Sequence, residues 1–176
     1  MNGAGRIVSI RKAGKEDLPL IHDMADVVFR HTYKDILSPE QMEYMMEWMY
    51  SLPNLERQLL EGHTYYIASI GGVPAGYVSI QGPADPGASP QVFHLQKIYV
   101  MPGAQKQGLG LKLLEKAKEH VRSLGGGAQC RIELNVNRGN GAVGFYEKMG
   151  FRILRQGDFP IGGGFYMNDY IMGLDI

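Results

Sequence analysis

The sequence predicts an α/β fold of three layers, in which helices cover both faces of a mixed β-sheet. In the first half of the chain, β-rich segments at residues 65–70 and 75–80 flank Gly-Gly-Val-Pro, a pattern typical of a β-hairpin. The second half alternates strand, helix, strand, helix and strand, which favours parallel neighbours joined by crossovers. We therefore expect antiparallel strands early in the chain and parallel strands in the middle of the sheet.

Length and composition limit the class of protein. The 176 residues match one globular domain, so we expect a single domain over residues 1–176. The net charge is zero, which disfavours a nucleic-acid partner because such binding depends on neutralising phosphates. The single cysteine, Cys130, permits no internal disulfide and no cysteine metal cluster. With no secretory signal and no long apolar run, we expect a cytoplasmic protein without a metal or a membrane partner.

Three helices are predicted after a first strand at residues 6–11. Apolar residues recur at helical spacing from Leu18 to Phe29, with Asp17 as the candidate N-cap. A stronger helix start follows at Ser38-Pro39-Glu40-Gln41, where serine is the cap, proline takes the first helical position and glutamine stands three residues on. Leucines after Pro53 indicate a further helical turn.

A change of parity within residues 92–100 indicates a β-bulge. Apolar residues occupy the odd positions 93 and 95, whereas the next two, Ile98 and Val100, occupy even positions. Because strand side chains alternate with a period of two, an inserted residue near Gln96 and Lys97 would keep all four on one face.

The second half of the chain predicts four more elements. After a loop at residues 101–110 comes a helix that ends at a run of glycines, 125–127, followed by an alternating strand at residues 131–137. A short helix at residues 142–149 and strands at residues 151–155 and 166–173 close the fold. The long helix should bury one apolar stripe, made of Leu109, Leu113, Ala117, Val121 and Leu124.

The segment from Ile98 to Gly110 joins a strand, a tight loop and a helix start, an arrangement typical of phosphate binding. Backbone N–H groups at a helix N-terminus attract phosphate, and Gly108 and Gly110 would let a ligand oxygen approach the main chain. Lys106 could add a positive charge. The alternative is a surface turn whose glycines serve geometry alone. The segment lacks the Gly-Lys-Ser/Thr of a P-loop and the third glycine of a dinucleotide fingerprint.

Two segments together resemble the GNAT superfamily of acetyl-CoA-dependent N-acetyltransferases. The first is similar to the pyrophosphate loop of that family and reads Gln105-Lys106-Gln107-Gly108-Leu109-Gly110. The second is similar to its Asn, Ala, Phe-Tyr-Glu-Lys and Gly-Phe segment and comprises Asn140, Ala142, Phe145-Tyr146-Glu147-Lys148 and Gly150-Phe151. The ending Asp169-Tyr170-Ile171-Met172 also resembles the last strand of bacterial polyamine-type members.

The resemblance implies a GNAT-like sheet that is splayed at its centre, with acetyl-CoA as a co-substrate between the bulged strand and the strand at residues 131–137. The N–H groups of residues 105–110 would hold the pyrophosphate, and the main chain of residues 98–100 would hold the pantetheine arm. The Val100 N–H would be a candidate oxyanion donor to the tetrahedral intermediate. The remaining cofactor contacts would come from Tyr99, Asn140, Ala142, Phe145, Tyr146 and Lys148.

The resemblance also places Tyr146 near the sulfur. A tyrosine hydroxyl has a pKa near 10 and suits a departing thiolate as a proton donor, although a core tyrosine is the alternative. Attack by an alkylamine needs a base, because such an amine is mostly protonated at pH 7. His94 and Glu133 are candidates, since they lie on the strands that flank the cleft. Many relatives carry glutamate where this chain has His94 and Gln96, so the base stays unassigned and a water relay is an alternative.

Charge is unevenly distributed along the chain and suggests an acceptor. Residues 16–61 hold ten acidic and three basic residues, whereas residues 97–155 hold eleven basic and four acidic residues. The basic part carries the CoA loops, and the acidic part contains the helices that line the acceptor side in the family. An acidic approach would attract a small cationic amine such as a polyamine. Acidic helix faces that serve solubility are the alternative.

These observations predict an N-acetyltransferase that moves an acetyl group to a primary amine by direct attack in a ternary complex. One alternative is a non-catalytic module that binds or senses acyl-CoA, and others are a protein N-terminus or an antibiotic amine as acceptor. A homodimer is implied by the resemblance alone.

Overall fold

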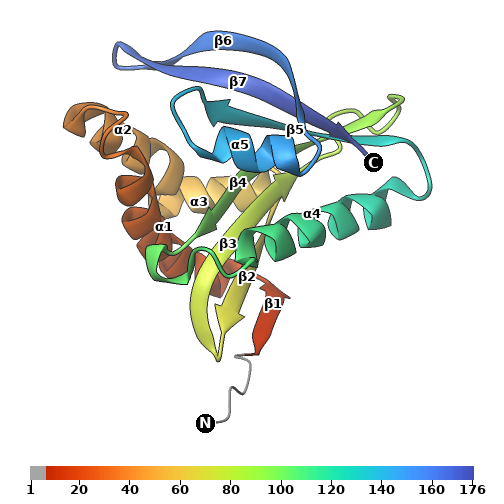
Figure 1. Cartoon of the computed structure of the whole chain (residues 1–176), viewed down its shortest axis with the longest axis horizontal. Helices are drawn as coiled ribbons and strands as arrows, with labels where there is room; N and C mark the ends of the chain where they lie inside the picture. Colours follow the sequence, from red (N-terminus) through yellow and green to blue (C-terminus); the bar gives the residue numbers. More distant parts are fainter. Residues whose placement is uncertain (1–6) are drawn as a thin grey trace.

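The centre of the molecule is a seven-stranded sheet with the strand order β1-β2-β3-β4-β5-β7-β6 (Figure 1). The structure is a computed structural model that describes residues 7–176. Strands β4 and β5 are parallel, and the other neighbouring pairs are antiparallel. The predicted mixed sheet is therefore confirmed, with its parallel pair in the middle.

The elements follow the predicted order. The strands are β1 (Val8–Lys12), β2 (His63–Ile70), β3 (Val73–Gln81), β4 (Gln91–Val100), β5 (Cys130–Asn137), β6 (Arg152–Gly162) and β7 (Phe165–Asp175). The helices are α1 (Leu18–Tyr33), α2 (Pro39–Tyr50), α3 (Leu52–Leu60), α4 (Leu109–Gly125) and α5 (Ala142–Lys148), with 3₁₀ turns at Lys15–Asp17 and Pro102–Ala104. No helix within residues 7–176 is long and apolar enough to cross a membrane.

Helices cover both faces of the sheet and create two apolar cores. One core joins α4 and α5 to the sheet and includes Leu113 and Ile132, both fully buried. The other joins α1, α2 and α3 to the opposite face and includes Phe29 and Tyr50. Figure 1 shows α1, α2 and α3 gathered on one side of the sheet and α4 and α5 on the other. This arrangement confirms the three-layer fold, with each buried large side chain contributing roughly 1.5–3 kcal/mol.

The start of α2 matches the capping signal in the sequence, whereas the start of α1 differs. The Ser38 hydroxyl accepts a hydrogen bond from the Gln41 N–H at 3.1 Å, and Pro39 takes the first helical position. Asp17 precedes α1 but makes no capping bond to it. Its carboxylate instead accepts bonds from Arg11 at 2.7 and 2.9 Å and from the Gly14 N–H at 2.8 Å, which ties β1 to α1.

The predicted β-bulge in β4 is confirmed. Lys97 pairs with Ser79 of β3 and Leu95 pairs with Ile80, so Gln96 has no counterpart on β3. The extra residue keeps the apolar side chains of β4 on the α4 face and directs Lys97 toward the face covered by α1, α2 and α3.

Three details differ from the expectations. The first strand runs over Val8–Lys12, and residue 6 lies outside the described residues. The closing strands are longer than predicted, because Gly157 and Pro160, which normally weaken strands, lie inside the β6–β7 ribbon. Leu124 is 54% exposed. The last turn of α4 instead packs Gly125 against the Cys130 sulfur, where an added Cβ would lie 2.6 Å away.

Candidate active site

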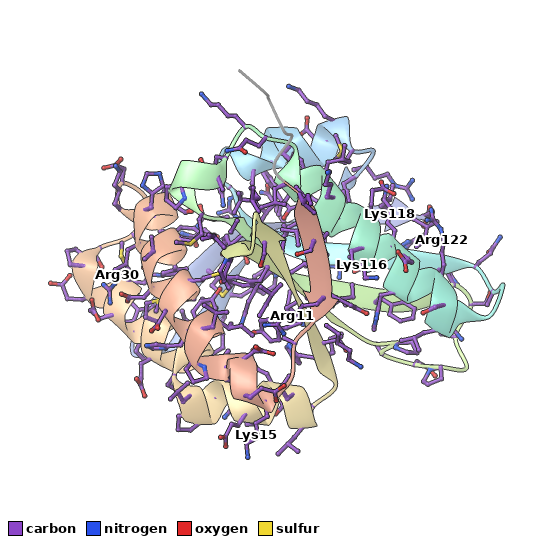
Figure 2. The ribbon with its side chains drawn as sticks, turned by 90° about the horizontal axis from the view of Figure 1, so that it is seen from below. Arg11, Lys15, Arg30, Lys116, Lys118 and Arg122 are labelled. Atoms are coloured by element: carbon purple, nitrogen blue, oxygen red, sulfur yellow. The ribbon has the colours of Figure 1, made fainter. Side chains whose placement is uncertain are left out.

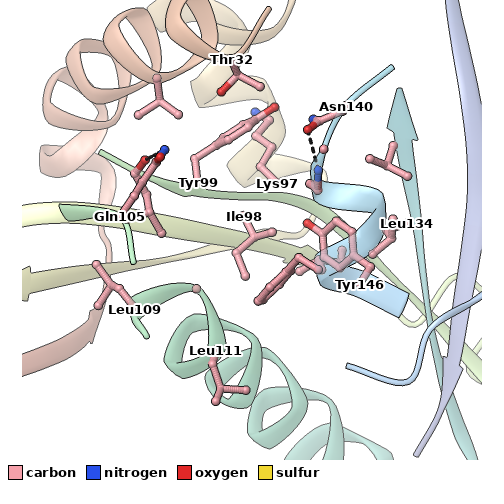
Figure 3. A pocket seen from close by; sticks show the side chains of 18 of the residues that line it. Thr32, Lys97, Ile98, Tyr99, Gln105, Leu109, Leu111, Leu134, Asn140 and Tyr146 are labelled. Atoms are coloured by element: carbon pink, nitrogen blue, oxygen red, sulfur yellow. Dashed lines mark hydrogen bonds between the residues drawn. The ribbon is translucent and has the colours of Figure 1, made fainter. Parts of the chain in front are cut away.

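The sheet opens at its centre into a hollow of about 810 Å³. Strands β4 and β5 pair only as far as Leu95 and Leu134, although both continue beyond this point. The hollow lies between the continuing halves and is closed by the loop before α4 and by α5 (Figure 3). The predicted central splay of the sheet is therefore present, with the bulge at its base.

Most of the residues predicted to hold the cofactor line this first hollow. They are Ile98, Tyr99, Val100, Gln105, Lys106, Gly108, Leu109, Gly110, Asn140, Ala142, Phe145 and Tyr146. Gln107 and Lys148 do not line it. The two sequence segments, about 30 residues apart, thus form opposite walls of one space.

The main chain of β4 presents polar groups to this opening. The Met101 N–H donates to the Ala75 carbonyl of β3 at 2.8 Å. Since N–H groups alternate sides along a strand, those of Val100 and Ile98 point away from β3 and toward the opening. The Gln105 side chain donates to the Val100 carbonyl at 3.3 Å on that side. Donors at residues 98 and 100 are therefore placed where a strand-like ligand could pair with them.

The loop before α4 has the backbone conformation of an anion-binding turn. Lys106 and Gly108 both have left-handed φ angles, of 65° and 75°. Gly108 precedes the first turn of α4, whose leading N–H groups have no carbonyl partner inside the helix. These groups and the Lys106 side chain border the first hollow, and together they favour a phosphate there.

Tyr146 reaches the first hollow from α5. Its side chain is 7% exposed, and burial raises the pKa of its hydroxyl further above 10, so it keeps its proton at neutral pH. Figure 3 shows it pointing across the space toward Ile98. The Asn140 side chain accepts from the Ala142 N–H at 2.9 Å and donates to the Tyr33 hydroxyl at 3.3 Å, so it anchors the start of the helix that carries Tyr146.

A second hollow of about 490 Å³ lies on the face covered by α1, α2 and α3. It meets the first hollow along five residues that line both, namely Tyr33, Gln96, Lys97, Tyr99 and Asn135. Two molecules entering from opposite faces of the sheet would thus meet between β4 and β5.

The two predicted bases occupy different places. His94 lines the second hollow, and burial lowers its pKa while the neighbouring Glu133 partly opposes that shift. Glu133 lines neither hollow, and its carboxylate lies 3.4 Å from Arg155 and 4.0 Å from Arg131. Both residues pair with each other before the strands part.

Lys97 is a buried cation that the sequence analysis did not single out. Its ammonium donates to the Tyr65 hydroxyl at 2.6 Å and to the side-chain amide oxygen of Gln58 at 3.0 Å, and it lies 4.2 Å from the Tyr50 ring centroid. No carboxylate of residues 7–176 pairs with it, and burial lowers its pKa to about 7. The parity change at the bulge is a signal that could have placed it on a covered face.

Asp169 is a buried anion that was also missed. It is 2% exposed, lines the second hollow and accepts a hydrogen bond from the Asn135 side chain at 3.3 Å. Burial raises its pKa, and the Asn135 bond and the charge of Arg138 partly oppose this. The alternation of the last strand could have indicated its face, but not its burial.

The acidic excess of residues 16–61 lies mostly outside the second hollow. Among the described residues that line it, Glu61 alone comes from those ten acidic side chains. On the outer face, Arg30 pairs with Asp26 and Glu43. Figure 2 shows Arg30 on α1 and Lys116, Lys118 and Arg122 along α4, where the two lysines pair with glutamates of the same helix. This distribution fits the alternative that the acidic faces serve solubility.

Comparisons with known proteins agree with this geometry. The model of the acetyltransferase (GNAT) family matches residues 29–151. A probable N-acetyltransferase of Mycobacterium tuberculosis is 28% identical over 148 residues, which cover 83% of this chain and 80% of that protein.

Solved structures share the fold. The PaiA N-acetyltransferase of Thermoplasma acidophilum, crystallised in complex with coenzyme A, has a TM-score of 0.78 at 22% identity and covers 97% of this chain and 99% of its own. A protein of Salmonella typhimurium described as a putative acetyltransferase, solved with its cofactor acetyl-CoA, has a TM-score of 0.62 at 22% identity and covers 95% of this chain and 92% of its own.

The matched residues 29–151 contain the bulged strand, the loop before α4, β5 and α5, which together build the meeting point of the two hollows. The family match and the geometry concern the same part of the chain, and the chain therefore belongs to the GNAT family and is one of its N-acetyltransferases.

Proposed function

We propose that this enzyme moves the acetyl group of acetyl-CoA to a primary amine by direct attack within a ternary complex. The supporting observation is the contact between the two hollows, which share five lining residues. A thioester in one and an amine in the other would be held together, which lowers the entropic cost of their reaction. Cys130 is buried in the α4 core and lines neither hollow, so a cysteinyl intermediate has no support.

Within this proposal, the first hollow takes acetyl-CoA. The N–H groups at the start of α4 and Lys106 bind the pyrophosphate, and the main chain of β4 binds the pantetheine arm. The Val100 N–H stabilises the negative charge that develops on the thioester oxygen during attack. Tyr146 supplies a proton to the departing sulfur. Two similar folds have been solved with coenzyme A or acetyl-CoA, which supports the choice of ligand.

Alanine substitutions at Gly108 and Gly110 are expected to distinguish two roles of this loop, its effect on protein stability and its binding of CoA. Gly110→Ala places a Cβ 3.5 Å from Phe145, an ordinary contact, on a residue that lines the hollow. We expect it to fold normally and to bind CoA about tenfold more weakly, a loss of about 1.4 kcal/mol. Gly108→Ala must adopt the left-handed φ of 75° and should also lose about 1 kcal/mol of stability.

Calorimetry with CoA and thermal unfolding measure these two effects. Gly87→Ala, in the loop between β3 and β4, is the control because its added Cβ is free of clashes and its φ is ordinary. Unchanged CoA affinity in Gly110→Ala would contradict the proposal that this loop binds the pyrophosphate. A wild-type protein that gives no heat with CoA would refute the cofactor assignment as a whole.

For the acceptor, we propose a small cationic amine such as a polyamine. Asp169 and Glu61 line the second hollow and would attract an ammonium group, although Lys97 and Arg57 line it as well. We expect spermidine to be acetylated faster than neutral or anionic amines when thiol release from acetyl-CoA is followed. An anionic or neutral amine that clearly outperforms spermidine would contradict this choice of acceptor but not the acetyl transfer itself.

A further inference from the structure

We propose that the Asp169 carboxylate binds the ammonium group of the acceptor and takes its proton before the amine attacks. The inference rests on the proposed acetyl transfer and adds to it the missing base.

Asp169 lies beside the point where the two hollows meet. It pairs with Asn137 across β5 and β7, on the face that also carries Asn135. The Asn135 side chain bonds to its carboxylate and lines both hollows. Tyr33 of α1, whose pKa is raised by burial and to a smaller extent by the charge of Asp169, lines both as well. An amine that approaches the thioester from the second hollow therefore passes next to this carboxylate.

The Asp169 carboxylate makes few polar contacts. Within residues 7–176 its side chain forms no ion pair and accepts one long hydrogen bond, of 3.3 Å. The charge of Arg138 acts on Asp169, but its guanidinium donates to Asp158 at 2.6 Å, to the Gly157 carbonyl at 3.0 Å and to the backbone carbonyl of Asp169 at 3.4 Å, not to the Asp169 carboxylate. A buried carboxylate without a counter-ion is costly, and an incoming ammonium group would remove that cost.

The other basic candidates point elsewhere. Glu133 lies outside both hollows between two arginines, and His94 lies in the part of β4 that still pairs with β5. Lys97 lines both hollows, but its ammonium reaches across Ser79 and donates to the Tyr65 hydroxyl on β2. Among residues 7–176, Asp169 is thus the acidic residue of the β5–β7 pair that lines the second hollow.

The proton and bond changes balance with the groups named. The ammonium R–NH₃⁺ gives one proton to the carboxylate and becomes R–NH₂, whose lone pair forms the new C–N bond to the thioester carbon. The C–S bond then breaks, and the sulfur takes a proton from the Tyr146 hydroxyl. The second proton lost by nitrogen restores that hydroxyl, and Asp169 returns its proton to water, so the products are the amide, free CoA thiol and one H⁺.

The test compares Asp169→Asn with wild type, using strongly and weakly basic amines over a range of pH. For a strongly basic amine near pH 7, we expect kcat/KM to fall about 100-fold or more, within the usual range for loss of a general base. The wild-type kcat/KM should level off well below the pKa of the amine. The kcat/KM of Asp169→Asn should keep rising until the pH reaches the pKa of the amine, because this variant depends on amine that has lost its proton in solution. The defect should shrink for a weakly basic amine.

Three controls keep other effects apart. Asp23→Asn removes an exposed carboxylate of α1 that lines neither hollow and should leave kcat/KM near the wild-type value. Asp169→Glu keeps a carboxylate and should recover part of the lost rate. CoA affinity should be unchanged in Asp169→Asn. Tyr33 and Arg138 face Asp169, and Lys97, His63 and His94 line the same hollow. Wild type and Asp169→Asn share all of these groups, so the difference between the two pH profiles reports on Asp169.

The outcomes distinguish the inference from the function on which it rests. If wild type acetylates no amine, the proposed function fails. If wild type is active and Asp169→Asn keeps its rate and its pH profile, Asp169 is not the base. If Asp169→Asn loses CoA binding, the wild-type profile decides, because a rate that rises with unit slope up to the pKa of the amine leaves no role for a carboxylate base.

Discussion

Replacing Lys97 by methionine is expected to stabilise the protein most at pH 7 and below, with a gain that disappears toward pH 10.5. Burial lowers the pKa of Lys97 from 10.5 to about 7 in the folded state. Between these values the unfolded chain binds one more proton than the folded chain, so wild-type stability rises with pH by about 1.4 kcal/mol per unit. Below the folded pKa the full cost of a buried charge is present. Methionine has no charge and removes this slope.

Urea unfolding at intervals from pH 6 to pH 10 measures the effect as the difference between wild type and Lys97→Met. Lys97→Arg tests the role of the charge, because a guanidinium stays charged even at pH 10. The destabilisation by a buried charge should therefore persist there in Lys97→Arg. Lys112→Met, at an exposed position of α4, should reproduce the wild-type slope. A constant difference between wild type and Lys97→Met across the whole range would mean that Lys97 is not neutralised by folding.

Tyr146→Phe is expected to lower kcat about 100-fold while CoA affinity stays near the wild-type value. The variant removes one oxygen from a side chain whose ring packs between Phe145 and Phe151, at centroid distances of 5.4 and 5.5 Å. Within residues 7–176, no side-chain hydrogen bond contributes to the pKa shift of Tyr146, so the loss of stability should be small. The defect should narrow above about pH 8.5, where a thiolate departs without a proton donor.

Steady-state kinetics with saturating acetyl-CoA, together with calorimetry, checks this expectation. Tyr170→Phe is a matched control, because Tyr170 is a partly buried tyrosine that lines neither hollow. Equal turnover in wild type and Tyr146→Phe would return Tyr146 to the alternative reading of a core tyrosine. A parallel loss of CoA binding would show that its part is to shape the hollow.

Local patterns predicted the frame of the site well. The parity change at residues 93–100 indicated the bulge, since strand alternation depends on neighbouring residues only. The glycines at 108 and 110 indicated a loop that opens onto a helix start, and in the structure Lys106 and Gly108 have left-handed φ angles. The Ser-Pro-Glu-Gln signal at residues 38–41 marked the start of α2 for the same reason, because capping bonds span three residues.

Charge was harder to place, because a sum over a segment does not tell which side chains face a cavity. The helices of residues 16–61 carry an acidic excess, but most of it is on outer faces, with Glu61 at the second hollow. Gln107 and Lys148 belong to the matching motifs and yet do not line the first hollow. A motif defines only the spacing of residues along the chain. Whether a given side chain faces the hollow depends on the local backbone conformation.

The sequence by itself determined the mixed sheet, the bulge, the glycine loop and the two segments that form the first hollow, because each depends on residues close together along the chain. Only the tertiary structure decided that Lys97 and Asp169 are buried charges. Lys97 is enclosed by side chains from α2, α3 and β2, and Asp169 is positioned by pairing with β5, 32 residues earlier at Asn137. Burial of an ionisable group is set by such distant contacts, and so is its chemistry.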